Sequence, residues 1–237
     1  MDSINSTHNP SLRYVLFACL LPVLVLPGIY WFESLGDINI YLNYETPPGQ
    51  ILYLFSKLAG MYALVLIWLQ VTLALLNQSM LGIHLVFWNV GFHRKLGLSA
   101  ALTVAIHAAL FVAGVSIRKS EFAFGLLLPN FTHGFYAFSV TIGVFAVYLI
   151  ISVVITGLLK KKKSTRLLWI HRLAVIAFIF AFIHSLLIGT ETRFSAMTFT
   201  YLIMGITLLF ALYMRFYKPA TGFQTPLSEK QHTPQSL

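Results

Sequence analysis

The sequence has very few charged side chains. Only 10 per cent of its 237 residues are Asp, Glu, Lys or Arg, and seven of these are acidic. A soluble domain carries about a quarter charged residues, so this composition excludes a soluble globular protein. It also excludes a disordered chain, because disorder requires low hydrophobicity and a high charge content.

Cysteine is nearly absent as well. The single residue, Cys19, lies in an apolar run, which excludes an intrachain disulfide framework and a cysteine-rich metal or iron–sulfur site. The alternating hydrophobicity of barrel strands is also missing, so any membrane-spanning backbone must satisfy its hydrogen bonds within helices.

What the chain has instead is apolar length. Hydrophobic residues make up 58 per cent of it, and the mean hydropathy is +0.80. A helix needs roughly 17–25 apolar residues to cross a bilayer, and six nearly uncharged runs are long enough. They cover residues 14–32, 51–76, 92–117, a run after Asn130 that reaches 159, 167–189 and 194–214. The prediction is an all-α integral membrane bundle of six transmembrane helices.

The six helices are expected to form one domain, residues 13–216, between two polar tails. The first run follows a polar flank, residues 1–12, and no small-residue cleavage site follows it, so we interpret it as a retained helix and not a signal peptide. Residues 217–237 contain three prolines and are expected to form a disordered cytoplasmic tail.

The basic residues indicate the orientation. The net charge of +9 does not indicate nucleic acid, because the cations lie in short loops between apolar runs. The segment 160–166 holds five of them, on the same side as Arg94, Lys95 and Arg215, whereas most acidic residues lie on the other side. The positive-inside rule then places both termini in the cytoplasm.

Four histidines lie inside two of the predicted spans. His93 and His107 are 14 residues apart in the third span, and His171 and His184 are 13 apart in the fifth. One span lies between these two, so they cross the membrane in the same direction. His93 should therefore be level with His171, and His107 with His184. At ~1.5 Å per residue the two levels are about 20 Å apart.

Two facing imidazoles suit a haem better than a zinc ion. Zinc usually takes four protein ligands or three with water, and the spans offer no further ligand at these heights. A haem supplies four nitrogens and leaves two axial positions for histidine. A lone helical histidine is more often a packed core residue than a ligand, but two matched pairs in costly intramembrane positions favour ligation. We therefore predict two b-type haems, with His93, His171, His107 and His184 as iron ligands.

The spacing in the fifth span requires an adjustment. Fourteen residues nearly return to the same face of a helix, whereas thirteen leave a rotation of about 140°. Tilt, a local distortion or a different direction of the haem must absorb this rotation.

Basic residues beside the ligands are candidates for contacts with the haem carboxylates. Arg94 and Arg172 each follow an inner-level histidine and could contact the inner haem together with Lys95. For the outer haem the candidates are Arg118, Lys119 and Arg193. Anchoring by the positive-inside rule is an equally good explanation for any one of them. Roles for His84 and His133, near the two membrane surfaces, stay open.

At these residues the sequence resembles the ferric-reductase-like transmembrane domain family. That family includes ferric-chelate reductases, NADPH oxidases and the haem subunit of the bacterial methionine-sulfoxide reductase system. The resemblance rests on six spans and on the four histidines, and it implies that His93 with His171 would hold the inner haem and His107 with His184 the outer one. It also implies an oxidoreductase subunit in the bacterial inner membrane.

The chain departs from the larger family members because no glycine-rich nucleotide fingerprint follows a strand. It is expected to be a stand-alone membrane subunit that receives electrons from a separate flavoprotein reductase or from quinol. The acceptors left open are ferric iron, oxygen or a periplasmic redox protein. The alternatives are a quinol-oxidising cytochrome b anchor and a non-redox transporter of metal or protons.

Overall fold

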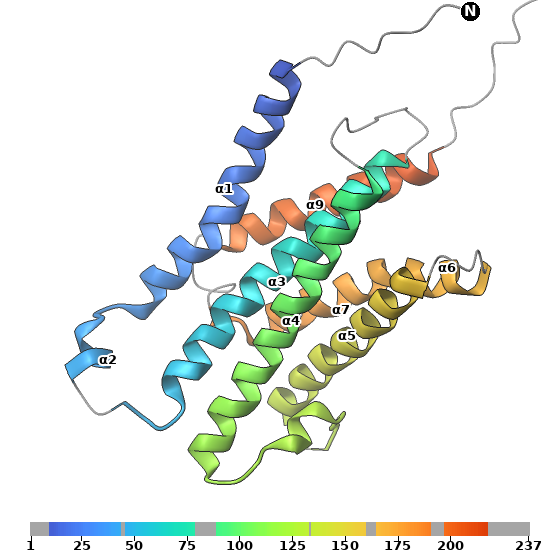
Figure 1. Cartoon of the computed structure of the whole chain (residues 1–237). Coiled ribbons are helices and arrows are strands. Elements are labelled where there is room, and N and C mark those ends of the chain that lie inside the picture. Colours follow the sequence, from blue (N-terminus) through green and yellow to red (C-terminus); the bar gives the residue numbers. More distant parts are fainter. Residues whose placement is uncertain are drawn as a thin grey trace, which may run out of the picture.

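The computed structural model describes residues 10–43, 46–78, 89–132, 134–159, 165–190 and 197–217. All regular structure within these ranges is helical (Figure 1). The elements are, in chain order, α1 (Pro10–Leu35), α2 (Asn39–Asn43), α3 (Gln50–Asn77), α4 (Val90–Lys119), the 3-10 helix η1 (Phe124–Leu127), α5 (Gly134–Leu159), α6 (Thr165–Arg172), α7 (Ala174–Ile188) and α9 (Met197–Phe216). The predicted all-α class is confirmed for the described residues.

Five helical segments are long and apolar enough to cross a membrane. They are α3, α4, α5, the consecutive helices α6 and α7 taken together, and α9. In α1 the apolar stretch Leu21–Leu35 is shorter, so the sixth span and the side on which the termini lie stay expectations. Large apolar side chains point outward from these helices, as with Phe199 at 70 per cent exposure and Leu209 at 67 per cent. Such a surface suits lipid and not water.

Helix α3 is the centre of the bundle. It packs against α4, α9, α1 and α7, and its middle is the most deeply buried part of the molecule, with Val65 fully buried. The indole of Trp68 donates to the backbone oxygen of Met204 and to Thr207 Oγ1 in α9, at 3.1 Å in both cases. This polar contact fixes α9 against α3 within an otherwise apolar interface.

Four of the helices form two facing pairs. Helix α3 packs along α4, and α5 packs along α7 (Figure 1). Between the pairs, α4 meets α5 and α3 meets α7, but α4 and α7 scarcely touch. Helix α4, with His93 and His107, therefore faces the α6–α7 segment, with His171 and His184, across a space that their own packing leaves open.

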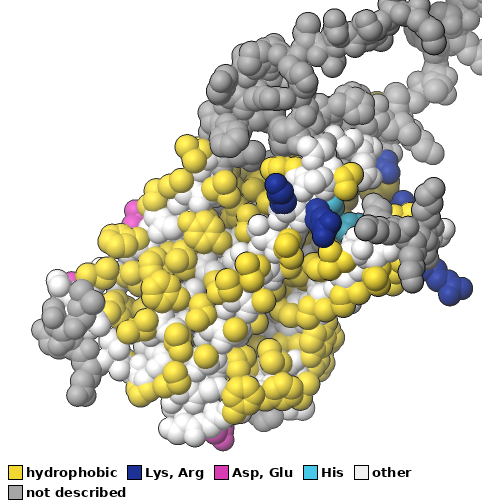
Figure 2. All heavy atoms as spheres, viewed as in Figure 1, with side chains coloured by type: hydrophobic (Ala, Val, Ile, Leu, Met, Phe, Trp, Pro, Cys, Tyr) yellow, Lys and Arg dark blue, Asp and Glu magenta, His cyan; other side chains and the backbone are white. Residues whose placement is uncertain are grey.

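The two ends of the bundle differ in charge. On the face shown in Figure 2, Lys and Arg side chains gather at the end where α6 lies, and Asp and Glu lie toward the opposite end. Hydrophobic side chains cover most of the surface between them. This separation follows the distribution of charged residues from which we inferred the orientation. We call the α6 end the inner end and the opposite end the outer end.

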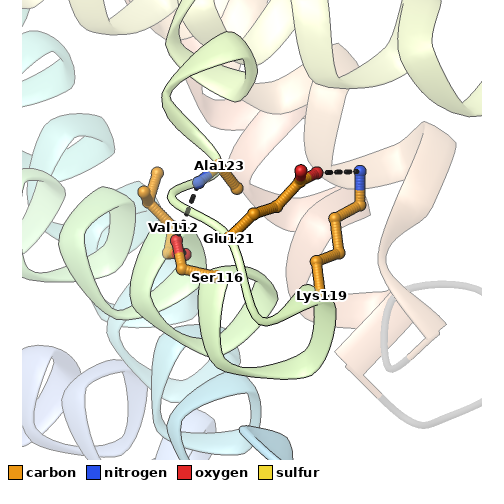
Figure 3. A network of polar contacts seen from close by, with 5 residues as sticks. All are labelled: Val112, Ser116, Lys119, Glu121 and Ala123. Carbon is orange, nitrogen blue, oxygen red and sulfur yellow. Dashed lines mark hydrogen bonds and ion pairs between the residues drawn. The ribbon is translucent and has the colours of Figure 1, made fainter.

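At the outer end, the chain after α4 turns back over the bundle (Figure 3). Ser116 Oγ donates to the backbone oxygen of Val112 at 2.7 Å and accepts from the Ala123 N–H at 2.9 Å. Lys119 forms an exposed ion pair with Glu121 at 4.0 Å. These contacts hold the turn that leads from α4 to η1, and η1 in turn contacts α5.

Candidate functional site

The structure brings the four histidines together in the two predicted pairs. The ring centroids of His93 and His171 are 5.9 Å apart, with an angle of 74° between the ring planes. Those of His107 and His184 are 6.4 Å apart, with an angle of 71°. Neither pair is stacked face to face, and each takes one ring from α4 and one from the α6–α7 segment.

These separations fit two imidazoles that share one metal ion. A metal–imidazole nitrogen bond is about 2.0–2.1 Å long, and a ring with ~1.33 Å bonds places its nitrogens roughly 1.1 Å from its centroid. Two rings bound to one metal on opposite sides should then have centroids about 6.3 Å apart. The observed values of 5.9 and 6.4 Å lie on either side of this distance.

A break in the fifth span lies between its two histidines. Helix α6 ends at Arg172 and α7 begins at Ala174. Leu173 between them has a ψ of −5°, and its N–H bonds to Ile170 three residues back, which is the tighter 3-10 pattern. A local distortion, one of the three adjustments considered for the 13-residue spacing, is thus present at Leu173.

Three of the four rings are held by backbone carbonyls of a neighbouring helix. The Nδ1 atoms of His107 and His184 lie 2.8 Å from the carbonyl oxygens of Ser56 and Ser139, respectively. His171 Nδ1 lies 3.2 Å from that of Val153. A carbonyl can only accept, so Nδ1 carries the hydrogen in each case and Nε2 keeps its lone pair. Metal-binding histidines are commonly held in this way.

Each of these three rings also packs against a glycine one turn beyond its carbonyl. A Cβ added to Gly60 would lie 2.9 Å from His107 Nδ1, and one added to Gly143 would lie 2.6 Å from His184 Nδ1. At Gly157 it would lie 3.3 Å from His171 Cε1. Sequence analysis missed these positions, although Ser56 with Gly60 and Ser139 with Gly143 are small residues four apart on one helix face, a pattern common in membrane helix packing.

His93 differs from the other three because its ring contacts the Gln70 side chain instead of a backbone carbonyl, although the Ser56 hydroxyl also lies 3.2 Å from His107 Nδ1. Gln70 Nε2 lies 2.9 Å from His93 Nδ1, 3.2 Å from its Nε2 and 3.0 Å from its backbone oxygen. Gln70 Oε1 is buried and has no hydrogen-bond partner within the described ranges. A half-turn of the amide exchanges its oxygen and nitrogen, and would let Oε1 accept from an Nδ1–H as the carbonyls do at the other rings.

The outer pair borders a cavity between α3, α4, α5 and α7. Its wall includes both rings and both adjacent glycines, together with apolar side chains and the polar groups of Lys57, Tyr53 and Tyr136. Leu126 and Leu127 of η1 close it from the outer end. The cavity is therefore mostly apolar with a few polar groups, as in many cofactor sites.

The basic residues predicted to contact haem carboxylates are exposed or have other contacts in the structure, and their contact with a haem stays a prediction. Arg94 is exposed, and the Arg172 guanidinium lies 4.9 Å from the centroid of the Trp169 ring. At the outer end, Arg118 Nη2 donates to Gln50 Oε1 at 2.6 Å and Lys119 pairs with Glu121. Arg193, His84 and His133 lie outside the described residues.

Among the described residues, no group of three or more His, Cys, Asp or Glu is placed to hold a metal ion. Two ligands at each level suit a metal that brings its other ligands with it, as iron does in a haem. No family model, curated protein or solved structure matches this chain. The fold and the site define an all-helical, apolar bundle with two histidine pairs, of the kind suited to a membrane.

Proposed function

We propose that the protein transfers electrons across a membrane through two b-type haems, one held by His93 and His171 and the other by His107 and His184. The observation that carries this proposal is the separation of 5.9 and 6.4 Å between the paired rings, close to that of two imidazoles on one metal. A haem bound through two histidines supplies an iron that exchanges one electron without binding a further ligand.

The chain's own residues would orient and insulate these groups. The carbonyls of Ser56, Ser139 and Val153 hold Nδ1–H, which fixes the ring and increases the basicity of Nε2. The glycines allow the rings to lie close to the neighbouring helices. The apolar cavity wall excludes water, which favours a bound apolar ring system over a hydrated ion.

Electrons would enter at the inner, basic end from a separate flavoprotein reductase or from quinol. They would leave at the outer end to an acceptor such as ferric iron or a redox protein. In this proposal the protein is a ferric-reductase-like oxidoreductase subunit of the bacterial inner membrane, and the sixth span is α1.

The test is the haem content of the purified full-length chain, measured as the pyridine haemochrome. We expect two haems per chain and a low-spin spectrum in both redox states. One haem per chain would contradict the two-site proposal. A fully folded protein without a Soret band would exclude the function and favour a non-redox transporter. Reduction by a quinol analogue that is blocked by quinone-site inhibitors would identify quinol as the donor.

A further inference from the structure

Lys57 is a cation within a helix that is apolar enough to span a membrane. It lies seven residues from the start of α3, which is about 10 Å along the helix. Its Nζ donates to Thr190 Oγ1 at 2.9 Å and lies 5.8 Å from the centroid of the Tyr53 ring. A charge at such depth is costly, and such residues commonly have a functional role.

Lys57 lines the same cavity as the outer histidine pair. It directly follows Ser56, whose carbonyl oxygen accepts from His107 Nδ1. Thr190 lies six residues after His184, just beyond the end of α7 at Ile188. The ammonium group thus lies at the outer edge of the cavity, between α3 and the end of α7.

Two of the cations predicted for this role have different contacts, and the third, Arg193, lies outside the described residues. Arg118 bonds to Gln50 at 2.6 Å, and Lys119 is an exposed partner of Glu121. Among the described residues, Lys57 is the Lys or Arg that contributes to the cavity wall. Its position places a positive charge beside the space that borders His107 and His184.

We propose that Lys57 binds a carboxylate of the haem held by His107 and His184, an inference that rests on the proposed function. A haem b carries two carboxylates, and its ring system is apolar. The apolar wall suits the ring, and the ammonium group offers a charge-assisted hydrogen bond to an anion at the edge.

A purely structural role for Lys57 must be separated from this one. Thr190 lies just beyond the end of α7 at Ile188, and a cation near a helix C-terminus is stabilising. Loss of Lys57 could therefore disturb the end of α7 and weaken the site without any contact to a carboxylate. A test that changes the cofactor as well as the residue distinguishes the two roles.

The experiment titrates the full-length chain, prepared without haem, with haem b and with its dimethyl ester, which has no free carboxylate. The variants are Lys57→Met and Lys57→Arg, with Lys119→Met as a control that removes a lysine at the same end. We expect Lys57→Met to bind one haem b normally and the second at least tenfold more weakly. Lys57→Arg and Lys119→Met should bind both as the unmodified chain does.

With the dimethyl ester, Lys57→Met should bind like the unmodified chain, because the group that Lys57 contacts is absent. Equal weakening with both cofactors, or no weakening with haem b, would overturn the proposal. The proposal would also be overturned if Lys57→Met bound haem normally but reduced ferric citrate more slowly. That result would indicate that Lys57 binds the electron acceptor. An unmodified chain that binds neither cofactor would refute the proposed function itself, whereas two haems with an unaffected Lys57→Met variant would refute only the role of Lys57.

Discussion

The Nδ1 atom of His184 lies 2.8 Å from the backbone carbonyl oxygen of Ser139. Gly143, one turn farther along α5, leaves the space in which the ring sits. Because the acceptor belongs to the backbone, no change of the Ser139 side chain removes it directly. Substitution of the glycine is the direct way to displace the ring, and the same holds for Gly60 with His107.

Replacement of Gly143 by alanine should disrupt the outer site. The new Cβ would lie 2.6 Å from His184 Nδ1, so the ring must shift, at a cost of about 1–3 kcal/mol for overpacking. We expect loss of one of the two haems, measured as haem per chain and by the low-spin spectrum. Gly205→Ala is the matched control, because its Cβ would lie at an ordinary 3.7 Å from Phe182. Two haems in Gly143→Ala would show that the ring does not need this position.

The two histidine pairs should fail independently. His184→Ala should remove the outer haem and leave an inner haem that is still reduced from the inner side, since His93 and His171 are intact. His171→Ala should leave the outer haem in place but not reducible from inside. Stopped-flow spectra and reduction of an impermeant external acceptor distinguish these states. A His184→Ala protein that reduces this acceptor at the unmodified rate would contradict the two-haem path.

Gln70 should tune the inner haem. Gln70→Leu removes the group beside His93 Nδ1, and loss of such a partner commonly weakens metal binding 10–100-fold. Gln70→Glu offers a carboxylate to Nδ1–H and makes the imidazole more electron-donating, so the inner midpoint potential should fall. Potentiometric titration checks both, with the outer haem as the internal control. Unchanged inner potential and affinity in both variants would assign Gln70 to packing alone.

The inner end should face the cytoplasm. Residues 160–164 lie outside the described residues, so this prediction rests on the five cations of residues 160–166. In a chain with Cys19→Ser, a cysteine at Ser164 should resist an impermeant thiol reagent added to intact cells. Glu121→Cys, at the exposed outer turn, should react and serves as the control. The reverse labelling pattern would invert the proposed direction of electron flow.

The sequence was sufficient to predict five of the long helices and which histidine rings lie beside each other, whereas the sixth span stays a prediction. Long apolar runs have few folded alternatives in a membrane, and the observed bounds of α3, α4 and α5 lie within a few residues of the predicted ones. The equal direction of two spans then fixes which histidines share a level. The mismatch between spacings of 14 and 13 indicated that the fifth span needs an adjustment by tilt, local distortion or haem direction, and the break at Leu173 is a distortion of that span.

The surroundings of the rings could not be predicted in the same way. Ser56 with Gly60 has the spacing of ordinary close helix packing, and only the register between α3 and α4 shows that this pair faces His107. Gln70 and Lys57 are single polar residues on an apolar helix. Their roles depend on the direction in which α3 is rotated, which composition and spacing leave undetermined.

The distance between the two histidine levels has an electrical consequence. About 20 Å along α4 is roughly two-thirds of a ~30 Å hydrocarbon core. Moving one charge fully across a membrane potential of 100 mV corresponds to about 2.3 kcal/mol. In a cell that is negative inside, the free energy of an electron passing outward between the levels would therefore fall by about 1.5 kcal/mol per 100 mV. In the proposed orientation, an energised membrane drives this transfer outward, and the transfer in turn discharges the membrane.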